Sequence, residues 1–296
     1  MPTGYQLRER KSRFIRKLYP KPPQTVCPNM YVLDHANGCL FSPQCNYCYL
    51  KSTLGHMREH EAFTNVEQMA EEMRHWIARD DLDIYMLNAG TMSDSFSFEE
   101  VRPIVVQLVE VFRQYAKGRP HTLLFLTKGG RRECQPLYSI EPCENVIVSF
   151  SVTHPDAARR FEKGAATIED RLGAARELKA LGWRLRMRID PMFKGYDHTA
   201  IAEEVKALEP ERVTLGSLRA DPNLYRFIHD GTLDELEPPP GEGRPGRYPF
   251  EERLALYQQA TAVLNGAFPV ALCEEEAPMW DALGLDKEAR PCNCHV

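Results

Sequence analysis

The chain has 296 residues, of which 43% are hydrophobic and 27% are charged, and its net charge is −5. This balance excludes a disordered chain, and the sequence has no apolar run long enough to cross a membrane. The length suits one large α/β domain or two small ones, and the negative net charge gives no overall field that attracts nucleic acid.

The first 25 residues are locally basic and are predicted to form an N-terminal arm. Against one acid, Glu9, stand seven basic residues: Arg8, Arg10, Lys11, Arg13, Arg16, Lys17 and Lys21. Such a cluster is typical of an arm that contacts phosphates or of a solvated tail, and both interpretations stay open. The segment lacks the apolar core and cleavage site of a secretory signal, so we expect a cytoplasmic location without membrane association.

From residue 26 to about 218 the sequence alternates short β-rich runs with amphipathic helical patterns. This alternation is typical of parallel βα units. Apolar residues recur at helical spacing from Val66 and again from Val101, and Thr167 with Asp170 predicts a helix start. The expected strands are Met30–Leu33, Ile84–Asn88, Thr122–Thr127, Val146–Val152, Arg184–Ile189 and Val213–Gly216.

The last part of the chain, residues 221–296, is predicted to be an extension of the βα units. Prolines and glycines from 238 to 246 predict a loop, and a helix is expected from about Phe250 to Leu264. The run Glu274–Glu276 is expected to be solvated. The chain closes with a short segment that contains Cys292 and Cys294 and little apolar surface.

Nine cysteines, an odd number, indicate metal binding or catalysis more than a disulfide framework. Cys39, Cys45 and Cys48 follow the first expected strand directly, and loops there gather cofactors in parallel sheets. Three thiolates can hold three irons of a cubane cluster and leave the fourth iron open. The alternative is a non-enzymatic zinc module completed by His35, His56 or the terminal cysteines. The scattered Cys27, Cys134, Cys143 and Cys273 are expected to be ordinary buried thiols.

The run Cys45-Asn-Tyr-Cys48-Tyr-Leu50 resembles the signature of the radical S-adenosylmethionine (SAM) superfamily. Later segments resemble its spore photoproduct lyase branch: Thr91–Asp94, Leu126–Lys128, Ser149–Ser151, Ala166–Arg171 and Thr214–Arg219. The resemblance implies a partial (β/α)6 barrel over residues 26–220, followed by a helical and loop extension. It also implies a radical SAM enzyme, a lyase or transferase, that cleaves SAM reductively with a 4Fe–4S cluster and an electron donor such as flavodoxin or ferredoxin.

The same resemblance assigns roles to single positions of this sequence. Cys39, Cys45 and Cys48 match the cluster ligands, and Lys128 and Ser151 match residues that hold SAM. Ser93 and Asp94 lie in the matching Ser-Asp element. Tyr47 and Tyr49 match two tyrosines proposed to pass a hydrogen atom, and packing against SAM is the equal alternative for both.

Two departures from the branch bear on the substrate. Five residues separate Cys39 from Cys45 where the family motif has three, so the cluster loop is expected to differ. The stretch Ala89–Asp94 has no cysteine where the photoproduct lyase has its hydrogen donor. The substrate is therefore left unidentified, with two alternatives: repair of a pyrimidine photoproduct in DNA, or transfer of a SAM-derived group to a small-molecule or thiophilic acceptor such as arsenic. Nucleic acid is the less favoured partner.

Polar residues at the later strands add candidates. Arg186 and Arg188 share one face of their strand, where they would bind an anion such as a cofactor carboxylate or pair with helix acids. Arg219 is a similar cofactor-binding candidate. We also expect the terminal segment to fold over the barrel mouth, with Cys292 and Cys294 as catalytic thiols, as a second metal or cluster site, or as a site that captures a thiophilic substrate such as arsenic.

Overall fold

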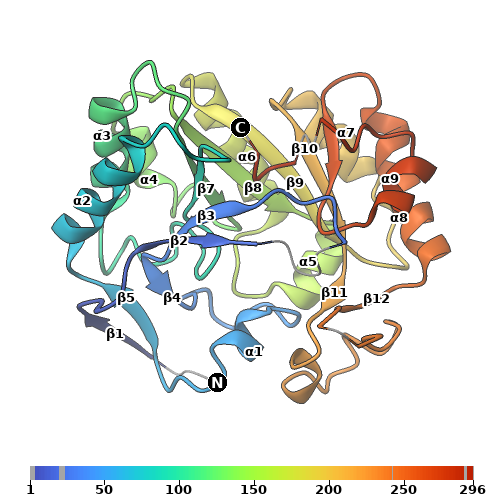
Figure 1. The fold of residues 1–296 in the computed structure, drawn as a ribbon. Helices are drawn as coiled ribbons and strands as arrows, with labels where there is room; N and C mark the ends of the chain where they lie inside the picture. The colour runs from blue at the N-terminus through green and yellow to red at the C-terminus, as the bar shows by residue number, and fades with distance from the viewer. Residues whose placement is uncertain (1–3, 20–23, 242, 290–291, 296) are drawn as a thin grey trace.

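The computed structural model describes residues 4–19, 24–241, 243–289 and 292–295. Its centre is an eight-stranded sheet in the order β13-β10-β9-β8-β7-β6-β3-β2, which curves around the middle of the molecule (Figure 1). All neighbouring strands from β3 to β13 pair in parallel, and β2 joins the β3 edge antiparallel. The sheet is thus a barrel left open between its two edges.

The six strands expected from the sequence are all present. β3 (Met30–Leu33), β7 (Thr122–Thr127) and β8 (Val146–Val152) have the predicted bounds. Two neighbouring strands extend beyond the prediction, β9 (Arg184–Met192) and β10 (Val213–Ser217), whereas β6 (Met86–Asn88) starts two residues late. β-branched and aliphatic side chains fill these strands, and both faces of β8 are buried.

Helices connect the strands and cover the outer face of the sheet (Figure 1). Thr167 caps one of them, since its Oγ1 accepts from Asp170 N at 3.2 Å, and Gly182 follows its end with a φ of 101°. The helices are α1 (Leu50–Thr53), α2 (Val66–Ile77), α3 (Val105–Tyr115), α4 (Gln135–Tyr138), α5 (Pro155–Phe161), α6 (Ile168–Ala180), α7 (Thr199–Ala207), α8 (Phe250–Leu264) and α9 (Ala277–Ala282), with the 3-10 turn η1 (Leu224–Arg226).

The basic N-terminal segment forms two strands. β1 (Tyr5–Arg8) pairs with β5 (His60–Phe63), which also pairs with β4 (Ala36–Asn37), and β2 (Ile15–Leu18) pairs with β3. Arg10 and Arg16 both contact buried Asp34, at 3.0 and 2.6 Å. The sequence analysis expected these basic residues to contact phosphate or solvent. Several of them instead form ion pairs within the fold.

The C-terminal extension closes the open side of the barrel. β11 (Arg219–Ala220) and β12 (Gly246–Arg247) form a small hairpin, while β13 (Val270–Leu272) adds a parallel strand beside β10. Residues 25 and 26 run antiparallel to 276 and 275, with Val26 N donating to Glu275 O at 2.9 Å. This contact joins the chain just before β3 to the chain just after β13.

The prediction of a solvated run at Glu274–Glu276 is wrong. Glu275 is 1% exposed and accepts from Tyr257 at 2.8 Å and from Arg253 at 3.0 Å. Glu274 pairs with Arg219. A carboxylate at the seam between β13 and residues 25–27 is surrounded by arginines, which compensate its burial.

Each helix of the described residues lacks the length or the apolar character needed to cross a bilayer.

Candidate active site

The cysteine triad lies on the loop between β4 and α1, at the carboxyl end of the parallel sheet. Cys39, Cys45 and Cys48 are free thiols, and Cys48 N donates to Cys45 O at 3.2 Å in the turn before α1. Burial is the main cause that raises the pKa of each thiol, and Cys45 and Cys48 together raise that of Cys39 further. Three soft donors on one loop at a barrel mouth suit a shared iron–sulfur group.

The long spacer between Cys39 and Cys45 packs on Gly164, in the loop that joins α5 and α6. A Cβ on Gly164 would lie 2.3 Å from Pro43 O and 2.5 Å from Ser42 N. Asn46 N donates to Phe161 O at 2.8 Å on the same side. The two extra residues of this motif are therefore accommodated by a close backbone approach that only glycine allows.

A fully buried carboxylate, Glu162, lies directly behind the cluster loop. It pairs with Lys128 at 3.1 Å and with Arg171 at 2.7 Å, and it accepts from the Tyr47 hydroxyl. Burial by itself would raise the pKa of Glu162, but the two cations lower it to about 2. Lys128 and Tyr47, both predicted from the sequence, are thus held together by an anion that the sequence analysis missed.

Asp94 fixes the end of β7 beside this group. Its carboxylate accepts from Thr127 Oγ1 at 2.9 Å and from Lys128 N at 2.7 Å. Burial raises the pKa of Asp94 to about 6, and these hydrogen bonds limit the rise. Ser93 is buried next to it and donates to Asp94 O. Both residues contact the backbone, so the structure gives them a positioning role, and their binding of SAM stays a prediction.

A second charged group occupies the carboxyl ends of β9 and β10. Asp190 pairs with Arg188 and, at 3.2 Å, with Arg219, and its backbone oxygen accepts from Lys128 Nζ at 3.2 Å. Gly216 admits this carboxylate, because a Cβ there would lie 2.6 Å from Asp190 Oδ1. Arg188 and Arg219 therefore already have an anionic partner, but it is an acid of β9 and not one of the helix acids that the sequence analysis considered.

The remaining predicted residues lie around these two groups. Ser151 is buried on β8, in register with Arg188, and its carbonyl accepts from Arg171 at 2.9 Å. Tyr49 directs its hydroxyl to Thr91 O. The hydroxyls of both tyrosines are engaged, which supports positioning of the loop and leaves hydrogen transfer as a prediction.

The C-terminal segment lies inside the barrel and not over its mouth. Arg186 Nη1 donates to Asn293 O at 2.8 Å and to His295 O at 2.6 Å, while Asn293 N donates to Thr214 Oγ1 at 2.9 Å. Residues 293 and 295 are therefore bonded to β9, and residue 293 also to β10. Buried Arg186 donates from Nη1 to main-chain carbonyls of this segment and pairs through Nε with Glu211 at 3.4 Å, whereas its Nη2 has no partner among the described residues.

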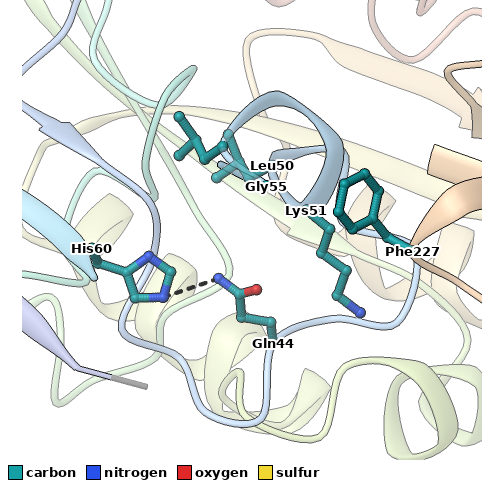
Figure 2. Close-up of a pocket in the computed structure, with 7 residues that line it drawn as sticks. Gln44, Leu50, Lys51, Gly55, His60 and Phe227 are labelled. Carbon is teal, nitrogen blue, oxygen red and sulfur yellow. Dashed lines mark hydrogen bonds between the residues drawn. The ribbon is translucent and has the colours of Figure 1, made fainter. Parts of the chain in front are cut away.

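A small pocket adjoins the outer side of the cluster loop (Figure 2). Gln44 from the spacer and His60 from β5 face each other across it, with Gln44 Nε2 3.2 Å from His60 Nε2. Lys51 and Phe227 line the other side. The pocket contains none of Lys128, Ser151 or Asp190, so it is separate from the predicted SAM-binding residues.

The sequence analysis missed Glu162 and the hydrogen-bonding role of Cys273. Glu162 was missed because it directly follows a short helix, where a single Glu is usually expected to be exposed to solvent. Arg171 offered a signal, since it lies on the buried face of α6 with a relative exposure of 0% and therefore needed an acid nearby.

The donor set fits the expected cofactors. Three thiols share one loop beside buried basic and acidic groups, at the edge of a partial parallel barrel, and this arrangement defines a radical SAM protein. The family model for spore photoproduct lyase matches residues 23–212. The chain therefore belongs to the spore photoproduct lyase family.

Individual relatives agree with this assignment. Spore photoproduct lyase of Bacillus subtilis (strain 168) is 23% identical over 189 residues, which cover 62% of this chain and 53% of that protein. The lyase of Geobacillus sp. (strain Y412MC61) is 24% identical over 164 residues, with 55% and 46% covered. The chain thus spans about half the length of the curated relatives it matches.

Solved structures show the same fold. A spore photoproduct lyase mutant matches with a TM-score of 0.73 at 19% identity, covering 90% of this chain and 81% of that chain. Another lyase mutant, with bound AdoMet and dinucleoside spore photoproduct, has a TM-score of 0.72 at 18% identity over the same shares. These findings confirm the branch and the partial barrel predicted from the sequence, and the cofactors of the family are a 4Fe–4S cluster and SAM.

Proposed function

We propose that this protein is a radical SAM lyase that acts on a pyrimidine lesion of DNA. The observation that carries the proposal is the cysteine triad beside the Glu162 and Asp190 groups, in a chain that belongs to the photoproduct lyase family. When bound, the cluster and SAM supply an electron and a 5′-deoxyadenosyl radical for hydrogen abstraction. The solved relative that holds dinucleoside spore photoproduct supports the substrate class.

The side chains of this protein would hold and orient the cofactors. Cys39, Cys45 and Cys48 would each bind one iron. The ammonium group of Lys128 contacts both Glu162 and the Asp190 carbonyl, and the side chain is one-fifth exposed. From there it would reach an anionic group of SAM. Asp190 holds Arg188 and Arg219 on the neighbouring strand ends, and their remaining N–H groups would orient a carboxylate or hydroxyls.

The absence of a cysteine from Ala89–Asp94 distinguishes this chain from the photoproduct lyase pattern. A lyase that lacks this donor must return hydrogen through another group, and Tyr47 and Tyr49 are the proposed alternatives. The two tyrosines flank Cys48 in the sequence, and their hydroxyls donate to Glu162 and to Thr91 O. The terminal cysteines are the other proposed donors.

The cofactor part is tested by changing Cys39, Cys45 and Cys48 together to Ala. Anaerobic reconstitution of this variant should give no reductive SAM cleavage, because the iron that would bind SAM is lost with its cluster. A matched variant with Cys134→Ala and Cys143→Ala, two buried free thiols away from the loop, should cleave SAM normally. Full SAM cleavage by the triad variant would refute the assignment of the site.

The substrate part is tested with dinucleoside spore photoproduct under reducing, anaerobic conditions. We expect conversion to the repaired dinucleotide, measured by chromatography, together with 5′-deoxyadenosine. Phe replacements at Tyr47 and Tyr49 should lower the yield of repaired product per SAM cleaved. SAM cleavage without any repaired dinucleotide would show that the enzyme acts on a different substrate.

A further inference from the structure

Four cysteines from three distant parts of the chain meet inside the barrel. Cys27 precedes β3, Cys273 follows β13, and Cys292 and Cys294 belong to the C-terminal segment. Residues 25 and 26 run antiparallel to 276 and 275, which places residue 27 opposite 274 and beside Cys273. Cys273 N in turn donates to Leu215 O at 2.7 Å on β10, and the terminal segment is bonded to Thr214 of the same strand.

Two of these sulfurs face basic or amide groups of the barrel wall. Arg188 Nη2 and Arg219 Nη2 each donate to Cys273 Sγ at 3.2 Å. Asn88 Nδ2, from the opposite side of the barrel, lies 4.0 Å from Cys294 Sγ. Such N–H contacts are the kind that stabilise thiolate sulfur at a metal centre.

All four thiols are free, and burial is the largest cause that raises their pKa. It brings the pKa of Cys27, Cys292 and Cys294 to about 12. The four sulfurs also act on one another: Cys273 raises the pKa of each of the other three. Ordinary buried thiols such as Cys134 show no such mutual effect.

Polar groups next to the cysteines lack partners among the described residues. Asn293, between two of the cysteines, is 0% exposed, and neither its Nδ2 nor its Oδ1 has a hydrogen-bond partner. Arg186 Nη2 and Ser149 Oγ, on adjacent strands in register, are also buried without partners. Buried polar groups are normally satisfied, so their grouping here indicates a site for a further group with hydrogen-bond acceptors.

We propose that Cys27, Cys273, Cys292 and Cys294 bind a second four-iron, four-sulfur cluster. Four thiolates are the full ligand set of such a cluster, and its sulfides would accept from the unpartnered N–H groups. Trivalent arsenic takes three thiolates and would leave one cysteine unused. This site shares no cysteine with the triad, but Arg188 and Arg219, which contact Cys273, also belong to the proposed SAM site.

Within the described ranges, no three His, Cys, Asp or Glu side chains are drawn together as one metal ion requires. This is true of the family's own triad, Cys39, Cys45 and Cys48, as much as of these four cysteines. A cluster and a zinc ion both take four thiolates, so metal analysis distinguishes them.

The experiment is iron and sulfide analysis of the full-length protein after anaerobic reconstitution, with electron paramagnetic resonance of the reduced form. Wild type should contain about eight irons per chain. The triad variant should keep about four irons and still show a cluster signal, whereas changing Cys27, Cys273, Cys292 and Cys294 to Ser should leave about four irons that give the signal of the triad cluster. The Cys134→Ala and Cys143→Ala control should match wild type.

A second variant covers the case in which the fourfold change prevents folding. Cys294→Ser alone replaces one thiolate by an oxygen ligand, so it should alter the resonance of the second cluster and not that of the first. About four irons in wild type, all lost from the triad variant, would overturn the proposal. Stoichiometric zinc, or arsenite bound in place of iron, would overturn it equally. Cysteines that hold a cluster have no free thiol, so a second cluster would also remove Cys292 and Cys294 as hydrogen donors.

Discussion

Glu162 illustrates how one buried carboxylate organises the residues around the cluster loop. Its oxygens pair with Lys128 and Arg171 and accept from the Tyr47 hydroxyl. The two cations compensate the charge of the buried carboxylate. Arg171 is fully buried and also donates to Ala166 O and Ser151 O, at 2.9 Å each. Removal of the acid would leave a buried guanidinium without an anion.

We therefore expect Glu162→Gln to destabilise the protein by about 3–5 kcal/mol, as the loss of one partner of a buried pair does. Chemical denaturation followed by circular dichroism measures the change. Glu177→Gln removes the exposed partner of Arg131 and should cost less than about 1 kcal/mol. Equal effects of the two changes would contradict the role of Glu162.

The lowered pKa of Glu162 also predicts how stability depends on pH. The pKa is about 2 in the folded protein, below its ordinary value of 4.5, so folding favours the ionised form. The contribution, on the order of 3 kcal/mol, is present above the unfolded value and is lost as pH falls from about 5 toward 2. Denaturation midpoints between pH 3 and 7 should show a smaller acid loss in Glu162→Gln than in wild type.

Lys128 is the residue that separates cofactor binding from cluster assembly. Lys128→Met should weaken SAM binding about tenfold or more and leave iron content unchanged, because its charge suits SAM and not iron. Titration of the reconstituted protein with SAM measures the affinity. Lys163→Met, an exposed lysine on the loop after α5, is the matched control. Unchanged affinity in Lys128→Met would remove this residue from the SAM site.

At the scale of elements, the cluster loop depends on a turn that belongs to a different βα unit. The spacer before Cys45 lies against Gly164, so the loop and the α5–α6 turn have to form together. Close backbone contact of this kind leaves no room for a methyl group. The longer cysteine spacing of this chain thus has a structural counterpart some 120 residues later.

We expect Gly164→Ala to reduce the iron retained after reconstitution by half or more, because the cysteines would no longer lie together. Iron per chain and the visible absorbance of the cluster measure this. Gly4→Ala is the control, since a Cβ at Gly4 would meet its nearest atom at 3.5 Å, an ordinary contact. Normal iron content in Gly164→Ala would show that the loop tolerates displacement.

At the scale of the whole molecule, the C-terminal segment is bonded to β9 and β10 of the barrel wall. Five hydrogen bonds connect residues 292–295 to Arg186, Arg212 and Thr214. Together with the contact of residues 25–26 with 275–276, they fill a barrel whose sheet is open between β2 and β13. The segment is therefore part of the core.

Truncation after Arg290 should lower the free energy of unfolding by about 3–5 kcal/mol, at roughly 1 kcal/mol for each hydrogen bond lost. In a chain of this size the melting temperature should fall by on the order of 10 °C, measured by calorimetry. Wild-type thermal stability in the truncated protein would show that the segment contributes nothing to the core.

The strands and the family could be predicted from the sequence, because both depend on residues that lie close together in the chain. Strand bounds such as Thr122–Thr127 and Val146–Val152 follow from continuous β-rich runs, and the triad with its flanking tyrosines was enough to indicate the family. The domain boundaries and most site roles stay predictions.

Contacts between charged side chains and thiols that are far apart in the sequence could be found only in the three-dimensional structure. Glu162 joins Lys128 across 34 positions of the chain, and Cys27 meets Cys273 through a seam between the first and last strands of the barrel. The basic N-terminal segment became β1 and β2 because Asp34 and Glu61 supply its partners. The hydrophobic periodicity of a segment predicts which of its side chains are buried. The partner of a buried charge or thiol comes from a distant segment, so it depends on how the sheet curves and closes.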